Sequence, residues 1–111
     1  MLWNHGTTER RKQNIIRRAF RSQSGLWGKG IYLTSSREAA YLFGQSLLMV
    51  KVDDSAVSHI YFEEFKKEFP DERSWAKAVS DKGYKALRIS YASGENELCV
   101  YDPDIIEAIH Y

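Results

Sequence analysis

Residues 25–34 read Gly25-Leu26-Trp27-Gly28-Lys29-Gly30-Ile31-Tyr32-Leu33-Thr34, with three glycines around a lysine and an aliphatic and aromatic run directly after them. Glycine permits positive φ and lets the backbone approach a ligand closely, so a loop of this composition leading into a strand is suited to ligand contact. The simpler interpretation is a glycine-rich turn before an ordinary strand. Two other segments of the chain favour the interpretation of this loop as part of a ligand-binding site.

These segments lie near the two ends of the chain. Leu2-Trp3-Asn4-His5-Gly6-Thr7-Thr8 reads as a short strand that ends in His-Gly-Thr. Asn96-Glu97-Leu98-Cys99-Val100-Tyr101-Asp102-Pro103 reads as a strand that begins with Asn-Glu and runs into Tyr-Asp-Pro. Because side chains alternate along a strand, Glu97 points away from the core if Leu98 and Val100 are buried.

In this order, the three segments resemble the His-Tyr-Glu branch of the ADP-ribosyltransferases, the diphtheria-toxin-like and poly(ADP-ribose)-polymerase-like enzymes. The matches fall at residues 2–8, 25–44 and 96–103, so they span the chain although close matching covers under half of it. The resemblance implies an α+β fold of two small packed antiparallel or mixed sheets with flanking helices, with residues 1–111 as a single minimal catalytic domain. It implies NAD as substrate, with ADP-ribose transferred to a macromolecular acceptor.

The resemblance assigns catalytic roles to His5, Tyr32 and Glu97. Glu97 matches the carboxylate that stabilises an oxocarbenium-like transition state. His5 matches the histidine that hydrogen-bonds a ribose hydroxyl, and Tyr32 the aromatic ring that stacks on nicotinamide. The backbone of Gly6 would pair with the nicotinamide amide. The remaining residues that the resemblance places around NAD are Thr7, Gly30 and Tyr41.

A second stacking aromatic is the point where the chain departs from the family pattern. The usual interval from Tyr32 lands on Phe43, but Tyr41-Leu42-Phe43-Gly44 fits the local sequence better with Tyr41 in the role and a loop two residues shorter. We therefore favour Tyr41 over Phe43. Trp27 is expected to pack inside its loop.

Charge is divided unevenly along the chain. Residues 1–30 hold seven Arg/Lys and one acid, and residues 31–111 hold nine Arg/Lys and fourteen acids, although the net charge is only +1. Such asymmetry indicates a face that meets a polyanion, either dinucleotide phosphates or a nucleic acid, and a solvated helix face is the alternative. A helix capped by Thr7 or Thr8 would bury a stripe of Ile15, Ile16, Ala19 and Phe20. Its exposed flanks would carry Arg10, Arg11, Arg17, Arg18 and Arg21.

The identity of the acceptor stays open between protein and nucleic acid. Glu95 lies two residues before Glu97, and in the other branch of this superfamily a residue at that position orients the acceptor. Its carboxylate could accept from a guanidinium or from the amino edge of a nucleobase. Arg17 and Arg21 would contact the phosphates of a nucleic-acid acceptor.

Local patterns predict several further elements. Ser35-Ser36-Arg37-Glu38 matches a capping box, with Ser35 as the N-cap of a helix that Gly44 ends. Residues 46–52 form an apolar run typical of a buried strand. Helical spacing recurs at residues 61–69 and, after an Asp71 cap, up to Gly83. Strands are expected at residues 84–91 and 105–111.

Three histidines and one cysteine provide neither zinc-ligand spacing nor an internal disulfide, so we expect no metal. With no long apolar run and no signal pattern, we expect no membrane association and a cytoplasmic location. The small size resembles bacterial or phage toxin-type transferases, which implies action in a target cell's cytoplasm and an antitoxin or immunity partner. The competing functions are a non-enzymatic NAD- or ADP-ribose-binding module, an NAD glycohydrolase, and an NAD-dependent RNA 2′-phosphotransferase.

Overall fold

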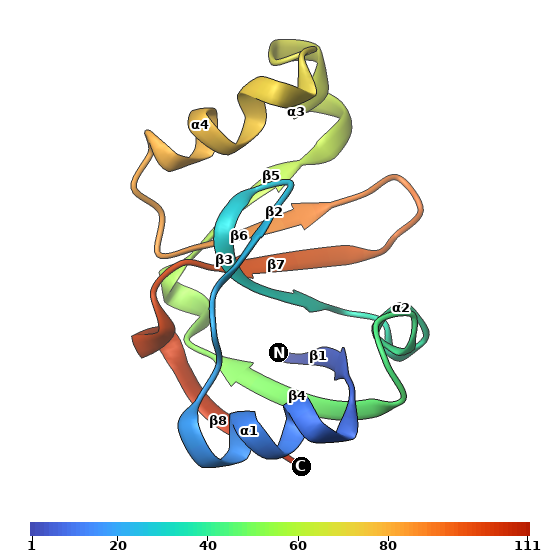
Figure 1. The fold of residues 1–111 in the computed structure, drawn as a ribbon. Helices are drawn as coiled ribbons and strands as arrows, with labels where there is room; N and C mark the ends of the chain where they lie inside the picture. The colour runs from blue at the N-terminus through green and yellow to red at the C-terminus, as the bar shows by residue number, and fades with distance from the viewer.

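The structure, a computed structural model that describes residues 1–111, is a mixed eight-stranded sheet flanked by four α-helices (Figure 1). The expected α+β class is thereby confirmed. The strands are β1 (Leu2–Thr7), β2 (Gln23–Gly25), β3 (Gly28–Thr34), β4 (Ser46–Val52), β5 (Val57–Tyr61), β6 (Ala86–Ser90), β7 (Asn96–Val100) and β8 (Ile106–His110). The helices are α1 (Glu9–Arg18), α2 (Arg37–Tyr41), α3 (Phe62–Glu68) and α4 (Trp75–Ser80).

The sheet has a narrow junction at its centre. Its strand order is β5-β6-β7-β3-β1-β4-β8, with β2 paired to β3 and only β5–β6 parallel. The central strands β1 and β3 share one register pair, Asn4↔Thr34. The Asn4 side chain reinforces it by donating to the carbonyls of Thr34 and Ser35, each at 3.2 Å. The sequence predicted two separate packed sheets, whereas the structure has one continuous hydrogen-bonded sheet whose two halves meet at this junction.

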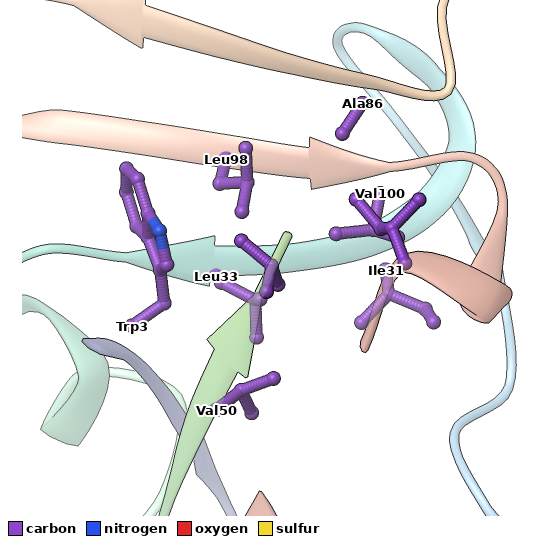
Figure 2. Packing of buried hydrophobic residues seen from close by; sticks show 9 residues of the cluster. Trp3, Ile31, Leu33, Val50, Ala86, Leu98 and Val100 are labelled. Carbon is purple, nitrogen blue, oxygen red and sulfur yellow. The ribbon is translucent and has the colours of Figure 1, made fainter. Parts of the chain in front are cut away.

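Both halves contribute to one hydrophobic core. Trp3 of β1 and Val50 of β4 come from one half, and Leu33 of β3 and Leu98 of β7 from the other (Figure 2). Val100 lies in the same cluster, so Leu98 and Val100 are buried on one face as their alternation predicts. The opposite face of β7 belongs to a second cluster, which joins Trp27 to α3 and α4 through Cys99, Trp75, Phe62 and Phe65.

Helix α1 is shorter than predicted and less buried. Thr8 caps it, its hydroxyl accepting from the Arg11 amide at 3.2 Å, but the helix ends at Arg18 and none of its residues is buried. Ala19 ends it with a φ of 85° and a ψ of 173°. The expected buried stripe is thus largely wrong: Ile16 and Ala19 are exposed, Ile15 is only half-buried, and only Phe20 packs against the core.

The conformation of Ala19 leads to a stability prediction. Residues other than glycine avoid this backbone region because the Cβ atom collides with neighbouring carbonyls, at a cost of about 1–3 kcal/mol. We expect Ala19→Gly to raise the free energy of unfolding by about 1 kcal/mol, measured by urea denaturation. Ala78→Gly, inside α4, should lower it by about 1 kcal/mol, and equal effects of both substitutions would contradict the assignment of strain to Ala19.

Two other local predictions differ from the structure. The N-cap of α2 is Ser36, whose Oγ accepts from the Ala39 amide at 3.1 Å, and not Ser35. The Ser35 hydroxyl accepts from the Asn96 amide at 3.0 Å and so ties α2 to β7. Strand β5 was not predicted, whereas β4 has the expected bounds. No helix has both the length and the apolar character needed to cross a membrane.

Candidate active site

A cleft of about 760 Å³ opens where β1 and β3 diverge beyond their single register pair. Residues 4–7 of β1 and 30–34 of β3 line it, together with Glu97 of β7. Helix α1 and the segment after it close another side, and Phe43 reaches in from the turn after α2. Beyond Asn4↔Thr34 no backbone ladder joins the facing edges of β1 and β3, and the Tyr32 carbonyl on this edge is bonded to the His5 ring.

Glu97 is held by two donors, one 70 residues away in the chain and one only six residues away. Its Oε1 atom accepts from the Trp27 indole Nε1 at 2.8 Å and from the Tyr91 hydroxyl at 3.0 Å. No protein group donates to Oε2. One carboxylate oxygen is therefore fixed, and the other remains available to a group in the cleft. Burial, together with the charge of Glu97, raises the pKa of Tyr91, so its hydroxyl stays a neutral donor.

His5 bridges the diverging strands. Its Nδ1 lies 3.1 Å from the Tyr32 carbonyl oxygen and, because a carbonyl only accepts, Nδ1 carries the proton. In the neutral ring Nε2 is then an acceptor. The ring packs edge-on against Phe20, with centroids 5.1 Å apart. Burial lowers the pKa of His5 below its ordinary value of 6.5, against the opposing effect of the Tyr32 hydrogen bond, and so favours the neutral form.

Tyr32 is fixed at the hydroxyl end of its side chain. Its hydroxyl donates to the Gly28 carbonyl at 2.6 Å and accepts from the Trp27 amide at 3.0 Å. The ring packs against Gly25, where a Cβ atom would lie 2.5 Å from the Tyr32 Cζ. Glycine is thus required at position 25 for the β2–β3 hairpin to close over this ring. Burial, more than any other influence, raises the pKa of Tyr32.

The smaller residues of the predicted site also line the cleft, and packing explains the glycines. A Cβ atom on Gly6 would overlap the backbone of Ala40 in α2, and one on Gly30 would lie 2.5 Å from the Cys99 Sγ. Thr7 is almost fully buried. Close approach between protein segments is therefore sufficient reason for Gly6 and Gly30, without a ligand.

The structure separates the two candidates for the second aromatic. Phe43 lines the cleft and Tyr41 does not, although Tyr41 was the preferred residue. Helix α2 ends at Tyr41, and the following turn carries Phe43 back toward β1 with its side chain 76% exposed. The geometry therefore favours Phe43 for contact with a ligand in the cleft.

The residues predicted to bind the acceptor also differ in whether they line the cleft. Arg21 lines the cleft, whereas Glu95 and Arg17 are exposed and do not.

The sequence analysis did not predict the two residues that donate to Glu97, which are Trp27 and Tyr91. It expected Trp27 only to pack, which it does, fully buried and stacked on Trp75 with centroids 5.3 Å apart. No local signal could identify a partner 70 residues away in the chain.

Two remaining groups bear on the chemistry. Burial raises the pKa of the Cys99 thiol to about 11, so the thiol stays protonated near neutral pH and is a poor nucleophile. No group of three or more His, Cys, Asp or Glu side chains is placed to hold a metal ion.

The lowered pKa of His5 leads to a pH prediction. Between pH 6.5 and the pKa of the folded state, the unfolded chain binds more protons, so the free energy of unfolding should decrease as the pH falls through this window. Urea denaturation of wild type and His5→Gln at about pH 7, 6 and 5 tests this. Burial also lowers the pKa of His59, so His59 adds to the pH dependence of the free energy of unfolding with the same sign. The variant His59→Gln measures that contribution separately. Parallel pH profiles for wild type and His5→Gln would contradict the prediction.

No protein-family model and no curated protein matches the chain.

Proposed function

We propose that the chain is an ADP-ribosyltransferase-like domain of the His-Tyr-Glu type that uses NAD to modify a macromolecular acceptor. The observation that carries the proposal is that His5, Tyr32 and Glu97, from three different strands, line one cleft. Glu97 has one carboxylate oxygen fixed and one free, as a group acting on a ligand requires.

The cleft fits a dinucleotide in size and in chemistry. Its volume of about 760 Å³ lies within the range of roughly 300–1,000 Å³ typical of small-molecule sites. His5, Tyr32 and Glu97 supply aromatic and polar groups to the cleft, and Arg11, Arg18 and Arg21, from α1 and the segment after it, line the same cleft. A ligand with a flat ring and phosphates would find a matching partner for each.

In this reaction NAD supplies the ADP-ribosyl group: the bond from ribose C1′ to nicotinamide breaks with its electron pair leaving on nicotinamide, and an acceptor nucleophile bonds to C1′ and loses its proton. Glu97 provides negative charge beside the ribose, where positive charge develops in the transition state. The Nε2 atom of His5 accepts a hydrogen bond from a ribose hydroxyl. Tyr32 presents its ring to the nicotinamide, and Phe43 could cover the other side.

The test is incubation of the protein with NAD labelled in its adenylate part, in the presence of a cell lysate. We expect release of nicotinamide together with label on macromolecules. Nicotinamide release without macromolecular label would indicate a glycohydrolase. NAD binding without any release would indicate a binding module, and either of these results would overturn the transferase proposal.

A further inference from the structure

Helix α1 and the segment after it carry six basic side chains without a partner: Arg10, Arg11, Lys12, Arg17, Arg18 and Arg21. None of them takes part in an ion pair, since the ion pairs of the structure involve the N-terminal amine, Arg73 and Lys77. Glu9, the one acid of α1, accepts instead from Gln13 at 2.9 Å and from Ser46 at 2.6 Å. The positive charge of this helix is therefore not neutralised within the molecule.

The basic side chains are spread too widely for one dinucleotide. Arg11, Arg18 and Arg21 line the cleft, whereas the other three lie elsewhere on the helix surface. Arg11 and Arg18 are two turns apart, a separation of about 10 Å along the helix axis. A pyrophosphate carries two negative charges on adjacent groups, whereas six cations distributed along a helix match a longer chain of phosphates.

One exposed aromatic side chain lines the same cleft. Leu42 is 85% exposed and Phe43 is 76% exposed, in the turn between α2 and β4, and Phe43 lines the cleft with the three arginines. An exposed aromatic ring beside basic residues is the arrangement by which proteins hold single strands, with cations on the phosphates and a ring stacked on an unpaired base. A duplex keeps its bases stacked inside and has no use for the Phe43 ring.

We propose that this surface binds single-stranded nucleic acid, with phosphates on the basic residues of α1 and Arg21 and with a base against Phe43. Binding of this kind needs neither NAD nor Glu97. The binding proposal does not rest on the transferase function. Because Arg11, Arg18, Arg21 and Phe43 also line the cleft assigned to NAD, NAD and the strand would compete for these residues. An acidic protein would also be attracted to α1, but it would gain nothing specific from Phe43.

The test measures binding without NAD, by fluorescence anisotropy of a labelled oligothymidylate, the same strand in duplex form, and polyglutamate. We expect the single strand to bind most tightly, with affinity that falls as salt rises from about 50 to 200 mM. The triple variant Arg11→Gln, Arg18→Gln, Arg21→Gln should bind far more weakly, and its slope of log affinity against log salt should be shallower by about 0.7 for each phosphate that is no longer neutralised. Phe43→Ser should weaken binding by about tenfold.

The control removes equal charge elsewhere, through Lys67→Gln, Lys82→Gln and Lys85→Gln, all exposed and free of ion pairs. This control should bind almost as wild type does. Because the assay contains no NAD, its result does not depend on the transferase proposal. Equal affinity of the triple arginine variant and its control would overturn the proposal. Preference for the duplex would also overturn it, as would polyglutamate binding of equal strength that Phe43→Ser leaves unchanged.

Discussion

Glu97→Gln is expected to reduce ADP-ribosyl transfer by about 100- to 1,000-fold, the effect typical of removing one preorganised electrostatic group from an active site. The affinity for NAD should change little, because the carboxylate acts mainly on charge that exists in the transition state. Transfer is measured as label incorporated from NAD, and affinity by calorimetric titration.

The hydrogen bonds around Glu97 make glutamine a conservative replacement. The amide oxygen of glutamine can accept from both Trp27 Nε1 and the Tyr91 hydroxyl, which now bond to Oε1. The side chain therefore keeps its place while its negative charge is removed. Glu107→Gln, on the exposed surface of β8, is the matched control and should transfer at the wild-type rate. If Glu97→Gln retained near wild-type turnover, the proposed role of Glu97 would be wrong.

Removing one of the two donors to Glu97 is a milder change than removing the charge of Glu97. Tyr91→Phe removes one hydrogen bond to Oε1 and keeps the ring that packs against Phe62. We expect it to lower the turnover rate by less than Glu97→Gln does, with the affinity for NAD preserved. A purely structural role for Tyr91 would lower stability and leave the turnover rate of the folded enzyme unchanged.

The predictable parts of this fold are those set by neighbouring residues. Strand β4 follows from an apolar run bounded by Ser46 and Asp53, and the start of α1 follows from Thr8. The exposed edge strand β5 lacks such a signal, because its sequence mixes polar Ser58 and His59 with apolar residues and it pairs only with β6.

The site was partly predictable for a related reason. Single residues such as His5 and Glu97 lie in recognisable short segments, whereas their partners depend on strand register. Ser35 and Ser36 are locally equivalent caps, and the Asn96 amide, which approaches through the pairing of β3 with β7, decides between them. The end of α2 at Tyr41 likewise decides that Phe43, and not Tyr41, lines the cleft.

Gly6→Ala should be strongly destabilising, lowering the free energy of unfolding by about 3 kcal/mol or more. A Cβ atom at this position would overlap the carbonyl oxygen and carbon of Ala40. These are backbone atoms of α2, so no change of rotamer can relieve the overlap. Strand β1 and helix α2 would have to separate, and the packing of the buried Ala40 would be disrupted.

Gly83→Ala separates this close approach from the general cost of replacing glycine. Gly83 has a φ of 67°, but a Cβ atom there would meet nothing within 4 Å, so only backbone strain of about 1 kcal/mol is expected. Urea denaturation of both variants gives the comparison, and the result does not depend on any ligand or activity. Helix α2 thereby restrains the end of β1 that lines the cleft, alongside β4, which pairs with the same end through Thr7↔Ser46. Equal destabilisation by the two substitutions would show that α2 does not restrain β1 in this way.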